Sequence, residues 1–245
     1  MKPKIIGHRG YLKQAPENTL SSFRQAVKAG ADAIELDLHQ TVDGELVIHH
    51  DYTLGRPDNG SGNIFEKKFS EIQQVDAGSW FSKEYKSERI PTLENVFALF
   101  GDTIEYEIEL KESTLEFLNK VIAVVLRYNL LQHIEFTSPH LFVLGKLKQL
   151  CPQARTGVFF KTYPEWMRPE QGERIILNTL VVLPADVAHL PLPIINKKLV
   201  RKLKEHHKLV HVADCNELNS IRKAVELGCD QFSTNEIELA RKTLS

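Results

Sequence analysis

Charged side chains that could do chemistry follow or end several short apolar segments in the first half of this sequence. A histidine and an arginine, His8 and Arg9, close the first of these segments. Histidine can act as an acid or a base near neutral pH, and arginine binds anions such as phosphate. Alone, a His-Arg-Gly triplet can equally be a turn, so its meaning depends on the other segments. The further candidates at such positions are Glu35, Asp37, His50, Glu109 and Lys111.

Three of these candidates are carboxylates that would crowd together. Glu35 and Asp37 lie two residues apart in one predicted strand, so both side chains point to the same face. Glu109 and Lys111 are spaced in the same way in another strand. Three carboxylates at one place would repel one another strongly unless a cation neutralises them. An all-oxygen ligand set favours one hard divalent cation, Mg²⁺ or Ca²⁺, over zinc.

Two histidines and two cationic side chains complete the set. His8 and His50 come from separate strand ends and would supply an acid and a base. Arg9 and Lys111 add positive charge that suits phosphate oxygens. A metal ion, two histidines and two cations together predict phosphoryl chemistry, in which a phosphodiester is held by the charges and the histidines move protons.

Each candidate also has a structural interpretation. Paired carboxylates can be exposed residues of a sheet, and single histidines are more often structural than catalytic. Asp51 could merely cap or orient His50, whereas His49 is another candidate base but points to the opposite face of the strand. Glu107 shares a face with Glu109 and could lie one layer deeper or act as an extra ligand. The joint occurrence of these residues at successive strand ends favours the chemical interpretation.

The composition is that of a globular chain. A length of 245 residues without a composition break suits one large domain over residues 1–245. The net charge of −1 predicts no attraction to nucleic acid or anionic lipid. Three separated cysteines without a CxxC motif predict reduced thiols. The short apolar stretch at the N-terminus does not suit a signal peptide, and no apolar run is long enough for a membrane span, so a cytoplasmic location is expected. The oligomeric state is not predicted.

Strand-like and helix-like segments alternate along the chain. Residues 33–39 and 45–50 are separated by too few residues for a helical crossover, so they form either a hairpin or a crossover without a helix. Helices are predicted at 18–29, 92–100, 115–128, 141–150, 197–207 and 217–227, with one more at the C-terminus. Strands are predicted at 4–7, 33–39, 45–50, 103–110, 133–137, 156–160, 179–183, 209–212 and 231–234.

Repeated strand–helix units predict an α/β fold with a parallel sheet. The number and spacing of the strands favour a closed TIM (β/α)8 barrel over an open sheet, and no GxGxxG motif follows the first strand. Residues 52–90 are irregular and contain several glycines. A loop of this length predicts a functional insertion or a lid after the third strand. In a barrel, polar residues at the C-terminal strand ends face the active site.

These motifs resemble the glycerophosphodiester phosphodiesterase family, in its cytoplasmic bacterial type, whose fold is a TIM barrel. Order and spacing match over about residues 4–111. The second half of the chain resembles the family less. The matching motifs are His8-Arg9-Gly10, Pro16-Glu17-Asn18-Thr19, Glu35-Leu36-Asp37, Asp43-Gly44, His50-Asp51, Ile90-Pro91-Thr92-Leu93-Glu94 and Glu109-Leu110-Lys111.

The resemblance implies an enzyme that hydrolyses a glycerophosphodiester, a small-molecule substrate, to sn-glycerol 3-phosphate and an alcohol. It also implies one bound divalent cation, Mg²⁺ or Ca²⁺, and a small insertion at about residues 52–90 that partly covers the site. Of the two histidines, we take His8 as the base and His50 as the acid. The residues that the resemblance implies are Glu35, Asp37 and Glu109 as metal ligands, His8 and His50 as the acid–base pair, and Arg9, Lys111 and Glu17 at the substrate.

Departures from the family pattern concern the substrate more than the chemistry. Ala213 stands where the family usually has a tryptophan that lines the pocket for the alcohol, and Asn235 stands where the family has a final aspartate. The alcohol is therefore not predicted. Two alternatives remain, namely a related diesterase of the lysophospholipase D or phospholipase type, and a phosphodiester-binding protein with weakened catalysis.

Overall fold

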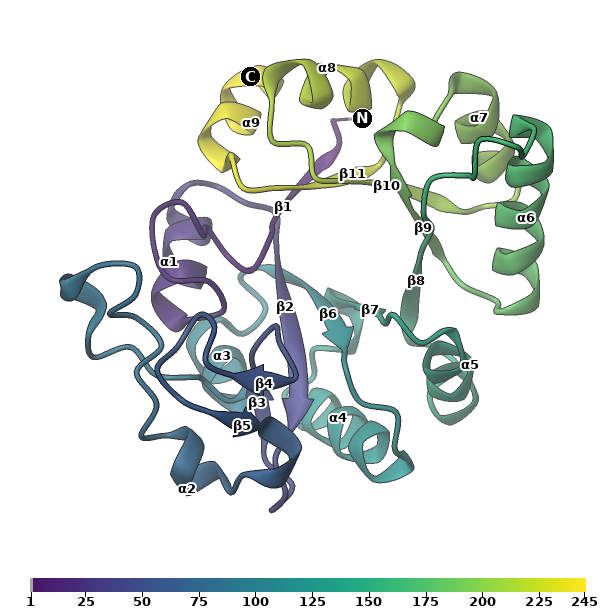
Figure 1. Cartoon of the computed structure of the whole chain (residues 1–245). Helices are drawn as coiled ribbons and strands as arrows, with labels where there is room; N and C mark the ends of the chain where they lie inside the picture. The colour runs from purple at the N-terminus through teal and green to yellow at the C-terminus, as the bar shows by residue number, and fades with distance from the viewer. Residues whose placement is uncertain (1) are drawn as a thin grey trace.

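The computed structural model describes residues 2–245, and its centre is a closed barrel of parallel strands. Figure 1 shows the ring, in which the first strand lies beside the last. Pairing between the first and second strands completes the closure. The predicted TIM barrel is therefore confirmed. The barrel strands, in order round the ring, are β1 (Lys4–Gly7), β2 (Ala33–Gln40), β6 (Glu105–Leu110), β7 (Ile134–Thr137), β8 (Arg155–Phe159), β9 (Val187–Pro191), β10 (Leu209–Ala213) and β11 (Gln231–Thr234).

Helices alternate with these strands and cover the outside of the barrel (Figure 1). Several begin near the predicted residue because a side chain caps the first turn, as Thr92 and Thr114 do by accepting a backbone N–H. In α4, Phe117, Val121 and Val125 repeat at helical spacing and are buried. The helices are α1 (Leu20–Lys28), α3 (Leu93–Phe100), α4 (Leu115–Arg127), α5 (Leu141–Leu150), α6 (Pro169–Val182), α7 (Lys197–Glu205), α8 (Leu218–Leu227) and α9 (Ile237–Leu244).

The third strand returns along the second as a hairpin. β3 (Leu46–Ile48) pairs antiparallel with β2, with Leu38 opposite Ile48, so the alternative that the sequence left open is settled in favour of the hairpin. The chain then continues inward, and the backbone N–H of His49 donates to the carbonyl oxygen of Asp37 at 3.0 Å. The hairpin thus returns the chain beside Asp37, although β3 is not a strand of the closed barrel.

One predicted strand is wrong. The apolar run 179–183 forms the last turn of α6 and the residue after it, and the strand in this part of the chain is β9. A short apolar run does not distinguish a strand from the end of a helix. Val181 and Val182 are largely exposed on the helix surface, whereas β9 carries the buried polar residue His189. Hydrophobicity therefore pointed to the wrong segment.

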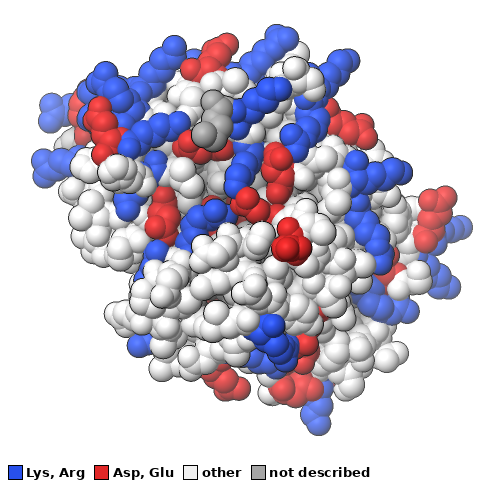
Figure 2. Space-filling model, turned by 180° about the vertical axis from the view of Figure 1, so that it is seen from behind, with Lys and Arg blue, Asp and Glu red and all other residues white. Residues whose placement is uncertain are grey.

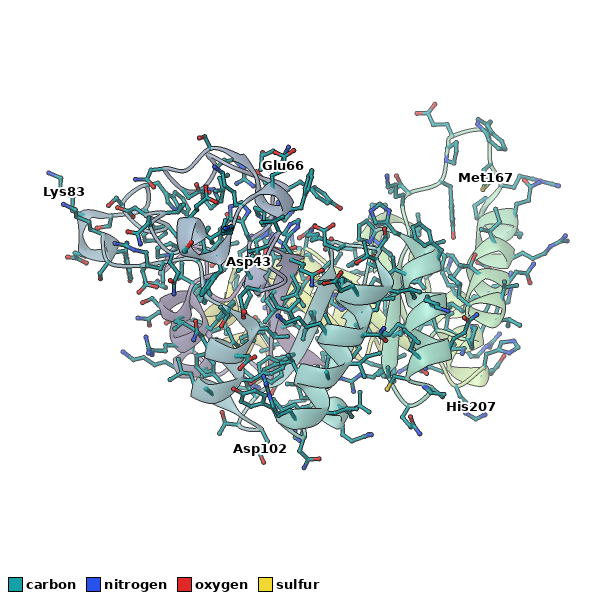
Figure 3. The ribbon with its side chains drawn as sticks, turned by 90° about the horizontal axis from the view of Figure 1, so that it is seen from below. Asp43, Glu66, Lys83, Asp102, Met167 and His207 are labelled. Atoms are coloured by element: carbon teal, nitrogen blue, oxygen red, sulfur yellow. The ribbon has the colours of Figure 1, made fainter. Side chains whose placement is uncertain are left out.

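The segment between β3 and α3 lies at the end of the barrel where the parallel strands finish. Figure 3 shows Glu66 of this segment and Met167, which follows β8, at one end of the molecule, and Asp102 and His207, which precede β6 and β10, at the other. The segment contains β4 (Thr53–Leu54), β5 (Gly62–Asn63) and α2 (Phe69–Ile72). It packs round an apolar cluster separate from the main core. The buried residues of this cluster are Val47, Leu54, Ile64, Ile72, Val75, Ala77 and Ile90.

The outer surface carries both signs of charge. Figure 2 shows the reverse of the view in Figure 1, with Lys and Arg interspersed among Asp and Glu. Among the described residues, no helix has the length and apolar character that a bilayer crossing needs.

Polar side chains also lie inside the barrel. Glu107, Glu135, His189 and His211 are each no more than 3% exposed. Gly157, on β8, lies against two of them, because a Cβ at this position would overlap the ring of His189 and lie 2.5 Å from Oε1 of Glu135. A glycine is therefore required here for the side chains of His189 and Glu135 to meet.

We expect Gly157→Ala to lower the free energy of unfolding by about 1–3 kcal/mol, because the added methyl group forces side chains out of their positions. Urea unfolding measures this change. Gly145→Ala is the matched control, since a Cβ on this residue of α5 would meet only Leu183 Cδ2, at 3.6 Å. Alanine favours a helix over glycine by up to about 1 kcal/mol, so Gly145→Ala should not destabilise the protein. Equal stability of wild type and Gly157→Ala would contradict the packing described.

Candidate active site

The turn after β1 places His8 and Arg9 at the mouth of the barrel. Arg9 has a φ of 54°, a left-handed conformation that is uncommon for arginine. Its backbone N–H donates to Oε2 of Glu35 at 2.8 Å, which holds the turn against β2. Gly10 has a φ of 88°, and a Cβ there would overlap Ser22. The His-Arg-Gly triplet is thus a tight turn and part of the site at once.

The three predicted metal ligands lie together. One oxygen atom from each of Glu35, Asp37 and Glu109 can be chosen so that all lie within 4.8 Å of one another. Adjacent strands explain this proximity, because Asp37 of β2 is directly beside Glu109 of β6 in the parallel register. Glu35 and Asp37 are buried, at 6% and 1% exposed. The spacing of Glu35 and Asp37 along one strand therefore correctly predicted that the carboxylates lie close together.

Two positively charged side chains, those of Lys111 and Arg9, form ion pairs with this cluster. Nζ of Lys111 lies 2.8 Å from Oδ1 of Asp37 and 2.5 Å from Oε1 of Glu109. Nε of Arg9 lies 3.6 Å from Oδ2 of Asp37. Burial opposes the ionisation of Asp37, but its pairing with Lys111 and Arg9 is the stronger effect and lowers its pKa. Asp37 is therefore ionised.

Glu35 is compensated only in part, by the charge and the backbone N–H of Arg9. Burial raises the pKa of Glu35 well above its ordinary value, and the neighbouring charges of Asp37 and Glu109 raise it further. A divalent cation near these oxygens would remove this repulsion. The donor set, three carboxylates with no sulfur or nitrogen, fits Mg²⁺ or Ca²⁺.

Asn18 belongs to the site although the sequence did not single it out as a site residue. Its Nδ2 donates to Oδ2 of Asp37 at 2.8 Å, and the residue is 4% exposed. A φ of 56° turns the chain at this point, a conformation that asparagine tolerates. The Pro-Glu-Asn-Thr motif contains Asn18, but its spacing from β2 gives no sign of this contact.

Glu17 lies beside Arg9 in the same motif. Its Oε1 accepts a hydrogen bond from Nη1 of Arg9 at 2.8 Å, and its Oε2 lies 3.8 Å from Nη1 of Arg56. The structure thus places Glu17 where it fixes the guanidinium of Arg9. Its predicted contact with substrate stays a prediction.

His8 is held by a residue from the other end of the chain. Nδ1 of His8 lies 3.1 Å from Oδ1 of Asn235, which can accept only from a protonated nitrogen. Burial lowers the pKa of His8, and the charge of Arg9 lowers it further. The hydrogen bond that His8 donates to Asn235 and the carboxylates of Asp37 and Asp214 offset part of this effect. Near neutral pH the ring is uncharged, with Nδ1–H donated to Asn235 and Nε2 free to accept a proton.

His50 is oriented by its neighbour. Nδ1 of His50 lies 2.5 Å from Oδ1 of Asp51. Arg56 donates two hydrogen bonds to the same carboxylate, with Nε 2.9 Å from Oδ2 and Nη2 2.7 Å from Oδ1. Burial acts against ionisation, but hydrogen bonds from Arg56 and His50 lower the pKa of Asp51 to about 2. Asp51 therefore orients His50, which is one of the roles that the sequence suggested for it. The contact of Arg56 with Asp51 was not predicted, because Arg56 lies in an irregular loop.

His49, the other candidate base, is engaged elsewhere. Its Nε2 lies 2.9 Å from Oδ2 of Asp58, and its Nδ1 lies 2.8 Å from the carbonyl oxygen of Asp51. Both ring nitrogens thus hold the insertion together, which favours a structural role.

A cavity of about 200 Å³ opens beside the carboxylates on the side of His8. His50 lines a separate, smaller pocket together with Glu17 and Asn18. The carboxylate of Asp37 acts to raise the pKa of His8, and His50 contributes to lowering the pKa of Asp37, so Asp37 interacts electrostatically with both histidines. The cavity is lined by His8, Glu35, Glu107, Glu109, Phe159, His211, Ala213, Asp214 and Ser233.

The amino-acid sequence is similar to those of known proteins. A sequence profile of the glycerophosphoryl diester phosphodiesterase family matches residues 8–239. The chain belongs to this family. A glycerophosphodiester phosphodiesterase of Caldanaerobacter subterraneus subsp. tengcongensis is 37% identical over 165 residues, which cover 66% of this chain and 68% of that protein. One of Bacillus subtilis is 30% identical over 255 residues, covering 97% of this chain and 85% of the relative.

Solved structures of the glycerophosphodiester phosphodiesterase family share the fold. A phosphodiesterase of Oleispira antarctica, solved in complex with the product sn-glycerol-3-phosphate, has a TM-score of 0.81 and 28% identity, covering 99% of this chain and 97% of that one. The glycerophosphodiester phosphodiesterase of Agrobacterium tumefaciens has a TM-score of 0.85 and 24% identity, covering 98% and 99%. These similarities confirm the predicted family and the prediction of an enzyme, and they extend into the second half of the chain, where the motifs fade.

We expect Lys111→Met to lower the free energy of unfolding by about 3–5 kcal/mol in the presence of a chelator, because Asp37 and Glu109 lose their buried cation. Added Mg²⁺ or Ca²⁺ should restore part of this loss. Lys67→Met, which breaks a surface pair with Glu71, should cost less than about 1 kcal/mol and show no metal dependence. Urea unfolding with and without the divalent cation measures both. Similar losses in the two variants would contradict a buried charge cluster.

Proposed function

We propose that this protein hydrolyses a glycerophosphodiester to sn-glycerol 3-phosphate and an alcohol, with a divalent cation and an acid–base pair of histidines. The observation that carries the proposal is the carboxylate cluster of Glu35, Asp37 and Glu109, in which Asp37 interacts electrostatically with both His8 and His50. The complex of the Oleispira antarctica phosphodiesterase with sn-glycerol-3-phosphate supports the same product here.

The carboxylate cluster would hold the cation, which, when bound, would polarise a phosphate oxygen and acidify the attacking hydroxyl or water. Lys111 and Arg9 keep Asp37 ionised and add positive charge beside the phosphate. Asn18 fixes Asp37 from a third direction. These fixed charges are set before substrate arrives, so little reorganisation is needed in the transition state.

The two histidines have different partners, and these suit different tasks. His8 donates Nδ1–H to a neutral amide, Asn235, and its depressed pKa leaves Nε2 ready to accept a proton from the attacking group. Nδ1 of His50 lies 2.5 Å from Oδ1 of Asp51, which holds the ring in place and leaves Nε2 for the leaving alcohol. We therefore assign His8 as the base and His50 as the acid that protonates the leaving alcohol.

The dimensions of the cavity favour a small soluble diester over a lysophospholipid. Its volume of about 200 Å³ suits a glycerophosphate group. Ala213 and Phe159 line it next to the charged residues, and Ala213 stands where the family usually has a tryptophan. The weakened binding protein is less well supported, because the complete set of proposed catalytic side chains and ligands lies in place.

We expect His8→Asn and His50→Asn to lower kcat on glycerophosphocholine by about 10²–10⁴-fold each, since each removes one proton transfer. His207→Asn is the control, because His207 is exposed at the opposite end of the barrel (Figure 3). Chelation should abolish turnover, and Mg²⁺ or Ca²⁺ should restore it. The assay follows release of sn-glycerol 3-phosphate. Full activity of His8→Asn, or full activity after chelation, would overturn the proposal.

The pH profile provides a separate test of the role of His8. If neutral His8 is the base, kcat/KM falls as pH drops through its pKa, and this limb should have a midpoint below the ordinary histidine value of 6.5. Asn235→Asp should move the midpoint upward, because a carboxylate stabilises the imidazolium. Asn129→Asp, at an exposed position, should leave it unchanged. An unchanged midpoint in Asn235→Asp would contradict the assignment.

A further inference from the structure

One buried carboxylate of the insertion has no part in the mechanism described above. The side chain of Asp58 is fully enclosed, with 0% of its surface exposed. Asp58 belongs to the turn between β4 and β5, which pair antiparallel. Its Oδ1 accepts backbone N–H groups from Gly55 at 3.0 Å and from Gly60 at 2.7 Å. A single carboxylate oxygen thus fixes both ends of the turn from residue 55 to residue 60.

The other oxygen of Asp58 holds the ring of His49. Oδ2 lies 2.9 Å from Nε2 of His49, and Nδ1 of the same ring lies 2.8 Å from the carbonyl oxygen of Asp51. Burial opposes the ionisation of Asp58, but hydrogen bonds from His49 and from two backbone N–H groups lower its pKa. The ring of His49 therefore connects an ionised carboxylate to the backbone of Asp51, the residue that follows His50.

The turn also holds the side chain of Asp51. Arg56 lies within the turn and donates two hydrogen bonds to the carboxylate of Asp51, at 2.9 and 2.7 Å. Nδ1 of His50 lies 2.5 Å from the same carboxylate. Asp58 is therefore connected to Asp51 in two ways. One connection runs through His49 to the backbone of Asp51, and the other runs through the turn and Arg56 to its side chain.

We propose that Asp58 is a positioning residue for His50 and acts on it through Asp51. This inference rests on the proposed hydrolysis, in which His50 protonates the leaving alcohol. Because the side chain of Arg56 is 56% exposed, packing alone does not fix it, and the turn that Asp58 closes sets its position. A displacement of about 1 Å in a catalytic group can cost about a hundredfold in rate. Loss of the Asp58 carboxylate would therefore be felt at His50.

Two substrates that differ in the leaving group test the proposal. Choline needs a proton as it leaves, whereas p-nitrophenolate is a stable anion and leaves without one. We expect Asp58→Ala to lower kcat on glycerophosphocholine by about 10–100-fold, but on the p-nitrophenyl ester of glycerol phosphate by less than about threefold. KM should change little, because the residues proposed to hold the phosphate are untouched. Equal losses of kcat on both substrates would overturn the proposal, since a general structural defect produces that result.

Asp76→Ala is the matched control, because Asp76 also closes a turn of the insertion. Its carboxylate accepts from the backbone N–H groups of Gly78 and Ser79. The kcat of Asp76→Ala should equal that of the wild type. Asp58→Asn is the conservative variant and should regain most of the activity that Asp58→Ala loses, because the amide oxygen can still accept from the turn and the amide N–H can donate to a neutral His49. A loss in Asp76→Ala as large as that in Asp58→Ala would overturn the proposal.

A second measurement covers the case in which Asp58→Ala does not fold. Arg56→Ala changes an exposed side chain and should show the same dependence on the leaving group. In the His50→Asn background, Arg56→Ala and Asp58→Asn should each change kcat by less than about twofold, because the group that they position is already gone. Additive losses would overturn the proposal. A wild type that does not hydrolyse glycerophosphocholine would contradict the proposed function, whereas full activity of Asp58→Ala in an active enzyme would contradict this inference alone.

Discussion

The arrangement of the whole site depends on one buried negative charge, that of Asp37. Lys111 and Arg9 stabilise it by ion pairing, and Asn18 donates a hydrogen bond to it. These partners come from three different loops or strands, so fixing one carboxylate also fixes the mouth of the barrel. Removing a cation from such a group leaves an uncompensated buried charge, which is costly. The turn of His8 and Arg9 thus contributes one of the partners that stabilise Asp37.

Much of this site could be predicted because its signals are local. Glu35 and Asp37, two residues apart on a buried strand, necessarily share a face, and the same holds for Glu109 and Lys111. Parallel strands then place their C-terminal ends at one mouth. The pattern of short apolar runs and intervening helices was sufficient for the barrel itself. Residue type and spacing were thus sufficient to predict which residues of the first half of the chain lie together in the candidate site.

The remaining features depend on contacts that spacing does not encode. His8 meets Asn235 from the far end of the sequence, and the contact exists only once β1 and β11 close the barrel. β9 was not predicted, because its sequence contains the polar residue His189. The apolar end of α6 has a more strand-like sequence and was predicted as the strand instead. Arg56 lies in an irregular loop without periodicity. In each case tertiary packing, not local propensity, decides the outcome.

The separate apolar cluster beneath the insertion has a consequence for how the enzyme loses activity. His50 is carried by the hairpin and loop that pack on Val47, Leu54 and Ile90, whereas His8 and the carboxylates belong to the barrel. Units with their own small core open at lower free energy than the whole protein. We therefore expect heating to displace His50 from the site before the barrel unfolds. Inactivation and global unfolding would then be two separate events, and the first would be reversible while the barrel keeps its shape.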